Sequence, residues 1–206
     1  MTASRNHLEV EVKFHINQPE TAVQNLTRIG AVAQPRVFET NLRFEDRGHT
    51  LKASHKLLRL RQDKACRLTY KSKPPQSDSQ CKVYRELEVE VVDFDTMRAI
   101  LQELGYHTAQ IYEKWRQVWR WKDVEICLDT MPYGTFLEIE GPQESIKSTA
   151  GRLHLSWKKR ILENYLAMFE ALRTHYYLPF KDVTFSNFKN CCADISPIIK
   201  RFEAGK

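Results

Sequence analysis

The segment from Leu8 to Ile16, LEVEVKFHI, alternates apolar and polar residues without interruption. In an extended strand this alternation places the apolar residues on one face and Glu9, Glu11 and Lys13 on the other. Glu9 and Glu11 then lie about 7 Å apart and point the same way. Hard divalent cations prefer carboxylate oxygens, whereas the charged face of an antiparallel sheet is often simply solvated. This strand therefore indicates either a cation site or a solvated sheet face.

Seven further segments alternate in the same way and predict strands, at 37–44, 57–62, 66–73, 83–92, 110–122, 124–129 and 135–141. Their charges are segregated by sign. Acidic residues recur on three strands as Glu9/Glu11, Glu86/Glu88/Glu90 and Glu138/Glu140, and basic residues recur on three others as Arg59/Arg61, Lys71/Lys73 and Lys114/Arg116. Charges facing water on an open sheet would be expected to mix freely, so the segregation favours charged faces that meet one another.

An eight-stranded antiparallel barrel satisfies this pattern, because a closed barrel can hold one small ligand. With the charged faces turned inward, both signs meet in one cavity and helices cover the apolar outside. Such an arrangement is costly in a dry cavity and reasonable in a wet one that holds a charged ligand with a metal. The predicted fold class is therefore α+β, a closed eight-stranded antiparallel barrel with helices packed outside.

Helical periodicity separates and follows the strands. Helices are predicted at 19–30, 93–104, 143–153 and 161–176, and the second of these has an apolar stripe of Phe94, Met97, Ile100, Leu101 and Leu104. Residues 177–206 show no clear period, so they are expected either to pack on the core or to hang loose. We expect a single domain over 1–206, with a barrel core at about 7–141, C-terminal helices at 142–176 and an irregular tail at 177–206.

Composition narrows the class of protein. The chain has 206 residues, 28% of them charged, and a net charge of +6. This excess suits an anionic small molecule and is too small to require nucleic acid. No apolar run approaches a membrane span, and the N-terminus lacks the apolar core of a signal peptide. Five cysteines without CxxC spacing indicate reduced thiols, so we expect a cytoplasmic protein. The adjacent Cys191-Cys192 is either a metal or redox site or, as we expect, a chance pair.

The ordered charges resemble those of the CYTH superfamily, the triphosphate tunnel metalloenzymes. The matching set covers 7 to about 175 and comprises Glu9-x-Glu11-x-Lys13, Arg59-x-Arg61, Lys71, Glu86/Glu88/Glu90, Lys114-x-Arg116, Asp129 and Glu138-x-Glu140. Any one of these motifs is weak, but their order is specific. The resemblance implies a tunnel whose basic side grips a triphosphate and whose acidic side binds Mg²⁺ or Mn²⁺.

The same resemblance implies roles for single residues. The phosphate-binding residues are expected to be Arg59, Arg61, Lys71, Lys114 and Arg116, and the metal ligands Glu9, Glu11, Asp129, Glu138 and Glu140. Lys73 and Arg120 share the inward parity near strand ends, where a solvated charge is an equal alternative. Lys13 is expected beside the reacting centre, either as a general base with a pKa depressed by cations or as a partner of Glu11.

Three functions remain open from the sequence, two of them catalytic. The first is hydrolysis of the terminal phosphoanhydride of inorganic, nucleoside or thiamine triphosphate, and the second is class IV adenylate cyclase activity, which converts ATP to cyclic AMP and pyrophosphate. Class IV cyclases often carry a His-Phe pair just before ExExK, which Arg5-Asn-His-Leu8 lacks. The third is a non-catalytic phosphate binder, which would gain little from its carboxylates. We expect a small-molecule partner, no nucleic acid and no membrane, and leave a homodimer open.

Overall fold

The computed structural model describes residues 7–74 and 80–205. Arg5 and Asn6, at the start of the segment compared with the class IV cyclases, lie outside the described residues. Within them the chain forms nine strands: β1 (Leu8–His15), β2 (Val32–Ala33), β3 (Val37–Glu45), β4 (Leu57–Gln62), β5 (Cys66–Ser72), β6 (Lys82–Val91), β7 (His107–Trp121), β8 (Val124–Met131) and β9 (Gly134–Glu140).

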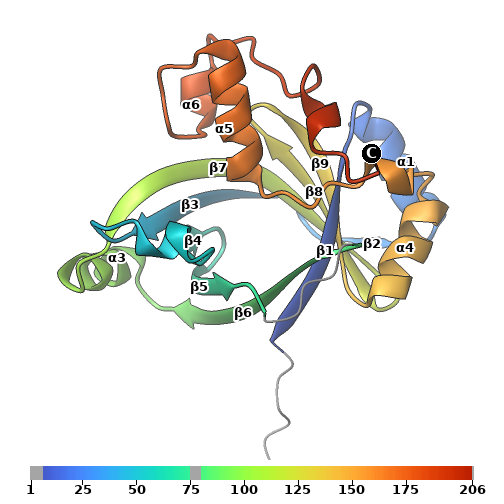
Figure 1. Cartoon of the computed structure of the whole chain (residues 1–206). Coiled ribbons are helices and arrows are strands. Elements are labelled where there is room, and N and C mark those ends of the chain that lie inside the picture. The colour runs from blue at the N-terminus through green and yellow to red at the C-terminus, as the bar shows by residue number, and fades with distance from the viewer. Residues whose placement is uncertain (1–6, 75–79, 206) are drawn as a thin grey trace, which may run out of the picture.

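Eight of these strands close into one antiparallel barrel. They follow the order β7-β3-β4-β5-β6-β1-β9-β8, and β8 pairs with β7 again to complete the circle. Figure 1 shows the strands curving around a central opening. The short β2 adds only two residues beside β7, at Val32 and Ala33. The predicted closed barrel and its eight strands are therefore confirmed. The sequence analysis did not predict β2, because a strand of two residues is too short to show an alternating pattern.

Helices cover the outside of the barrel. They are α1 (Pro19–Arg28), α2 (Thr50–Ala53), α3 (Phe94–Glu103), α4 (Gln143–Arg152), α5 (Tyr165–Tyr176) and α6 (Phe185–Phe188), with 3₁₀ turns at Trp157–Lys159 and Ile199–Arg201. In the part of the chain that the structure describes, no helix combines the length and apolarity needed to cross a bilayer.

The apolar faces of the strands point outward, as the alternation predicts. Val12, Ile126 and Ile139 are fully buried on the outer face, where Leu26 of α1 and Ile146 of α4 pack against them. Because this core lies between barrel and helices, the inside of the barrel is left to the polar faces.

Helix α3 buries fewer apolar side chains against the barrel than its apolar stripe predicts. Asp93 caps the helix by accepting a hydrogen bond of 2.6 Å from the Thr96 N–H. Leu101 is buried against Leu42, Phe44 and Leu60 of β3 and β4. Ile100 and Leu104 are 47% and 68% exposed, so the prediction that both belong to a buried stripe is wrong. Both are exposed because the helix turns a face narrower than its apolar stripe toward the barrel.

Helix α5 begins four residues later than its apolar period predicts. The N–H and C=O groups of Ile161 bond the backbone of Lys13 on β1, at 2.8 and 3.1 Å. Ile161 is therefore a bridge residue beside the barrel, which is incompatible with a helix there. Asn164 then caps α5 by accepting a hydrogen bond of 2.9 Å from the Ala167 N–H.

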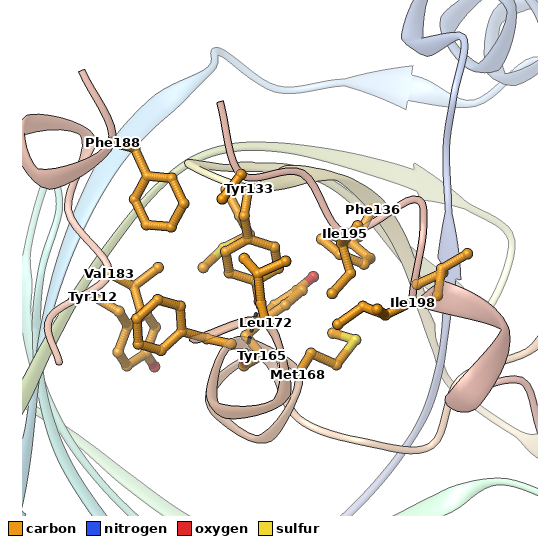
Figure 2. Packing of buried hydrophobic residues seen from close by; sticks show 14 of the residues in the cluster. Tyr112, Tyr133, Phe136, Tyr165, Met168, Leu172, Val183, Phe188, Ile195 and Ile198 are labelled. Carbon is orange, nitrogen blue, oxygen red and sulfur yellow. Dashed lines mark hydrogen bonds between the residues drawn. The ribbon is translucent and has the colours of Figure 1, made fainter. Parts of the chain in front are cut away.

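The described part of the tail packs on the core, which decides between the two predicted alternatives. Figure 2 shows Phe188, Ile195 and Ile198 of the tail meeting Leu172 of α5 and Tyr133 of the β8–β9 turn. The tail also bonds the barrel directly, because Val183 exchanges backbone hydrogen bonds of 2.8 and 2.9 Å with β7. Residues 177–205 therefore fasten α5 against the barrel.

Candidate active site

The inward faces of the barrel line a cavity of about 790 Å³. The sequence-predicted site residues that line it are Glu9, Glu11, Lys13, Arg59, Arg61, Lys71, Lys114, Arg116, Glu138 and Glu140. Asp129 is fully buried behind this lining. Lys73 and Arg120 do not line the cavity, and Arg120 instead lies 3.7 Å from Glu125 with a side chain that is 69% exposed.

The strand order divides the barrel by charge. The inward predicted cations lie on β4, β5 and β7 in one half of the circle, and the paired glutamates lie on β6, β1 and β9 in the other. The halves meet at two seams. Lys71 faces Glu86 in register across β5–β6, and Arg116 faces Asp129 across β7–β8. An anion at the basic half would therefore lie opposite carboxylates that suit a cation.

Arg59 and Arg61 project from β4 into the cavity. The Arg59 guanidinium donates hydrogen bonds to the Tyr112 hydroxyl at 3.3 Å and the Thr69 hydroxyl at 3.2 Å. Arg61 Nη2 lies 3.4 Å from Glu88 Oε2. These contacts fix the direction of both guanidinium groups, whose planar forks match phosphate oxygens.

Lys114 and Arg116 of β7 share the buried carboxylate of Asp129. Lys114 Nζ lies 2.9 Å from Asp129 Oδ2, and Arg116 donates to both oxygens at 2.7 and 2.6 Å. The Tyr165 hydroxyl of α5 donates a third contact to Asp129 Oδ2, at 2.9 Å. Asp129 therefore positions two predicted phosphate ligands, and its own oxygens are already occupied by these donors.

Glu39 of β3 is a second buried carboxylate, which the sequence-based prediction did not include. It lies beside the phosphate clamp, defined as Arg59, Arg61, Lys71, Lys114 and Arg116. Its carboxylate lies 3.4 Å from Lys114 Nζ, 3.8 Å from Arg61 Nη1 and 3.9 Å from Arg116 Nε. Burial would raise the pKa of Glu39, but Lys114, Arg116 and Arg61 outweigh it and lower the pKa to about 2. Glu39 therefore stays ionised and offsets the mutual repulsion of these cations.

Lys13 bridges two acidic residues. Its ammonium lies 2.5 Å from Glu11 Oε1 and 2.9 Å from Glu138 Oε1, and the side chain is 3% exposed. Burial alone would lower the pKa of Lys13, but Glu11 and Glu138 outweigh it and raise the pKa above its ordinary value. Carboxylates, and not the cations that would depress the pKa of a general base, are therefore the nearest partners of Lys13.

The acidic half holds Glu9, Glu11 and Glu140 at one side of the cavity. Burial, with Glu11 next, raises the pKa of Glu9 to about 7 although Lys71 lies 2.5 Å away. Burial, with Glu9 and Glu11 next, raises the pKa of Glu140 to about 8. A cation bound beside these carboxylates would lower both pKa values, because a nearby positive charge favours the ionised form.

These carboxylates fit a hard divalent cation by their donor chemistry. As the side chains stand, however, no three Asp, Glu, His or Cys groups of the described residues converge as a ready-made metal site. Glu11 contacts Lys13 and Lys82, the latter at 2.7 Å, and Glu9 contacts Lys71. A cation would therefore compete with lysines for Glu9 and Glu11, whereas Glu140 has no such partner among the described residues.

Helix α5 completes the wall of the cavity. Asn164, Leu166, Ala167, Glu170, Ala171 and Thr174 contribute to the lining together with Tyr165. Both Lys13 and Lys114 lie over the Tyr165 ring, at 5.3 and 5.5 Å from its centroid. The Tyr165 ring therefore contacts both ammonium groups, and its hydroxyl bonds Asp129.

Other lining residues also escaped the sequence analysis. They include Arg43 and Gln110 on β3 and β7, Lys82 and Tyr84 on β6, and Lys52, His55 and Lys56 around α2. For β3 a signal was present, because Glu39, Asn41 and Arg43 alternate with apolar or neutral residues just as the charges of β1 do. The residues around α2 follow no strand period, so the sequence offered no signal for them.

The comparisons agree with this geometry. The sequence model of the CYTH domain matches residues 7–163, which include every site residue predicted above. A Methanocaldococcus jannaschii protein named as a candidate adenylate cyclase is 27% identical over 167 residues, which are 80% of this chain and 89% of that protein.

Solved structures share the fold. A candidate adenylate cyclase from Vibrio parahaemolyticus superposes with a TM-score of 0.72 at 20% identity, over 81% of this chain and 99% of that one. The PH1012 protein of Pyrococcus horikoshii gives a TM-score of 0.66 at 26% identity, over 76% and 96% of the two chains. With the family match covering most of the sequence and the tunnel fold present, the chain belongs to the CYTH domain family.

Proposed function

We propose that the chain is a metal-dependent triphosphatase that hydrolyses the terminal phosphoanhydride of a triphosphate held in the cavity. The observation that carries the proposal is one cavity with a basic half and an acidic half facing each other. The basic side chains can bind the triphosphate, and the carboxylates can bind a metal ion that accompanies it. Enzymes that transfer phosphoryl groups work mainly by positioning and electrostatic stabilisation, which this arrangement provides.

The basic residues would hold the phosphates. Arg59 and Arg61 approach from β4, Lys71 from β5, and Lys114 with Arg116 from β7. Their carboxylate partners keep them oriented before the ligand arrives, so binding requires little reorganisation. Each fixed donor then contributes to the same anion.

The acidic residues would hold the metal. We propose Glu9, Glu11 and Glu140 as its main ligands with Glu138 beside them, whereas Asp129 is better placed to position Lys114 and Arg116. A bound Mg²⁺ or Mn²⁺ would neutralise charge on the phosphate oxygens and help to activate the attacking water. Because the ligands are all carboxylates, Zn²⁺ should substitute poorly.

Lys13 would act as a positioning residue. Its ammonium ties Glu11 to Glu138, one from β1 and one from β9, where the acidic half meets the clamp. A lysine so placed fixes both carboxylates relative to the phosphate ligands. We therefore propose positioning for Lys13 in place of proton abstraction.

Adenylate cyclase activity is the second candidate, supported by the name of the Methanocaldococcus jannaschii relative. A cyclase must also hold the adenine base. The aromatic rings of the described lining, apart from the imidazole of His55, are those of Tyr84, Tyr112 and Tyr165. The Tyr112 and Tyr165 hydroxyls contact Arg59 and Asp129, and the Lys82 ammonium lies 5.0 Å from the centroid of the Tyr84 ring, so all three tyrosines are already engaged by charged residues.

Product analysis separates the two activities. The protein is incubated with ATP and, separately, with inorganic tripolyphosphate, in Mg²⁺ or Mn²⁺ and in excess EDTA. We expect ADP with phosphate from ATP, pyrophosphate with phosphate from tripolyphosphate, and loss of both reactions in EDTA. Cyclic AMP with pyrophosphate would establish the cyclase, and full turnover in EDTA would refute metal dependence. Glu9→Gln and Glu140→Gln should each abolish turnover with the fold retained, as checked by circular dichroism.

A further inference from the structure

We propose that the cavity contains a second anion-binding region, which selects triphosphates whose remaining part carries further negative charge. The region is the basic mouth, defined by Arg43, Lys52, His55 and Lys56, all of which line the cavity. None of them belongs to the phosphate clamp described above. The inference rests on the proposed function, because it assumes that the clamp holds a triphosphate.

The basic mouth lies where β3 connects to β4. Arg43 faces Arg59 in register across β3–β4 and Gln110 across β3–β7. The connection through α2 carries Lys52, His55 and Lys56 at this same end of the two strands. These three residues are exposed, so the mouth adjoins Arg59 on one side and solvent on the other.

The cations of the mouth differ from those of the clamp in their partners. Each clamp cation has a carboxylate within 4 Å, such as Glu88 for Arg59 at 3.7 Å and Glu86 for Lys71 at 2.7 Å. Among the described residues, no carboxylate lies within that distance of the mouth cations. Arg43 Nε is even buried without a hydrogen-bond partner. Unpaired positive charge thus accumulates where the cavity opens.

The acidic residues near the mouth are engaged by other donors. Glu45 of β3 accepts backbone hydrogen bonds from Leu51 and Lys52, both at 2.9 Å, and Asp46 accepts one from Thr50. Glu170 of α5 also lines the cavity, and Lys52 contributes to lowering its pKa after the hydrogen bonds from Arg173. Those hydrogen bonds, at 2.5 and 3.1 Å, already engage both oxygens of Glu170. Because these carboxylates already have other donors, the side-chain cations of Arg43, Lys52 and Lys56 are left without an ion pair among the described residues.

Helix α5 runs along the cavity past the clamp. Tyr165 contacts Lys13 and Lys114, and Thr174 lines the cavity two and a half turns later. At 1.5 Å per residue, this stretch of the helix measures roughly 13 Å. The ligand can therefore extend from the clamp along α5 toward the mouth, past the small side chains of Ala167 and Ala171.

The chemistry of the mouth restricts the substrate. A cationic group such as that of thiamine triphosphate would be repelled there, and a neutral nucleoside would leave the cations unpaired. A further phosphate, either the next unit of a phosphate chain or a phosphate on a nucleoside, would pair with them. The mouth therefore favours a triphosphate that is extended by another anionic group.

Calorimetric binding without metal tests this inference independently of turnover. Two affinity ratios are measured: linear tetrapolyphosphate over tripolyphosphate, and ATP bearing a 3′-phosphate over ATP. Lys52→Gln/Lys56→Gln should lower at least one ratio roughly three- to tenfold, the sum of two partly exposed ion pairs. The control Lys147→Gln/Lys159→Gln removes the same charge from exposed lysines outside the cavity lining, and it should preserve both ratios.

Each outcome has one meaning. A fall in the first ratio alone assigns the mouth to a phosphate chain, a fall in the second alone assigns it to a phosphorylated nucleoside, and a fall in both assigns it to either source. Equal ratios in the Lys52/Lys56 variant and the control overturn the inference while leaving the clamp intact. Failure of tripolyphosphate itself to bind the unmodified protein would overturn the proposed function and, with it, the mouth.

Discussion

At the scale of single residues, the cavity is organised by carboxylates that touch cations and not by cations alone. Lys13, Lys114 and Arg116 each contact at least two acidic residues. In a buried ion pair, removal of one partner leaves an uncompensated charge and costs several kcal/mol. The effect of a substitution here should therefore depend on which charged partner remains buried without a counter-charge.

Substitution of Lys13 distinguishes positioning from phosphate binding. Lys13→Ala leaves Glu11 and Glu138 without their shared ammonium, so kcat should fall by about 100-fold or more as the acidic half loses its geometry. Arg59→Ala removes a clamp donor and should mainly raise KM. Steady-state kinetics on tripolyphosphate measures both, with Lys73→Ala as a control outside the cavity. The contrary outcome is a Lys13→Ala variant with normal kcat that binds tripolyphosphate as weakly as Arg59→Ala does. Lys13 would then be another residue of the phosphate clamp.

Glu39 gives a prediction that depends on pH. Its pKa of about 2 lies below the ordinary 4.5, so its ionised form stabilises the fold above pH 4.5, and that stability is lost as pH falls toward 2. Glu39→Gln should therefore lower the free energy of unfolding by about 3–5 kcal/mol at neutral pH. Urea denaturation should show this difference shrinking below pH 4.5. Glu103→Gln, on the exposed face of α3, is the control, and a difference that is independent of pH would contradict the assignment.

At the scale of elements, α5 belongs to the site as well as to the core. Its buried face packs on the β8–β9 turn and the tail, as Figure 2 shows, while Tyr165 reaches Asp129. The helix thereby transmits the packing of residues 177–205 to the clamp. A change in that packing should therefore shift Tyr165 and, through Asp129, the positions of Lys114 and Arg116.

Removal of one oxygen atom tests this link. Tyr165→Phe deletes the 2.9 Å hydrogen bond to Asp129 but keeps the ring that Lys13 and Lys114 contact. The variant should lose about 1–3 kcal/mol of stability and bind tripolyphosphate more weakly, because Asp129 loses a donor. Urea unfolding and calorimetry provide the measurements. Tyr177→Phe, at a side chain that is 91% exposed, is the matched control, and equal behaviour of the two variants would separate α5 from the clamp.

At the scale of the whole molecule, the sequence predicts the barrel better than its surroundings. Strand alternation is a local pattern, so the eight strands and their inward charges could be read directly. Helix α5 could not be placed as well, because the bonds that hold Ile161 beside Lys13 join residues far apart in sequence. Glu39 shows the same limit in part: the alternation of β3 places it on the inward face, but its pairing with clamp cations depends on β4 and β7 bringing those cations to it.

The position of β1 between β6 and β9 has a consequence for how the protein folds. Glu11 pairs in register with Glu140, 129 residues later in the chain, so the first described strand to be synthesised pairs with the last one. Such non-local pairing carries a large loop-closure cost and slows folding. Until β9 arrives, the paired glutamates of β1 line an open edge and no tunnel exists. A nascent chain would thus acquire its catalytic chemistry in one late step, when the circle of strands closes.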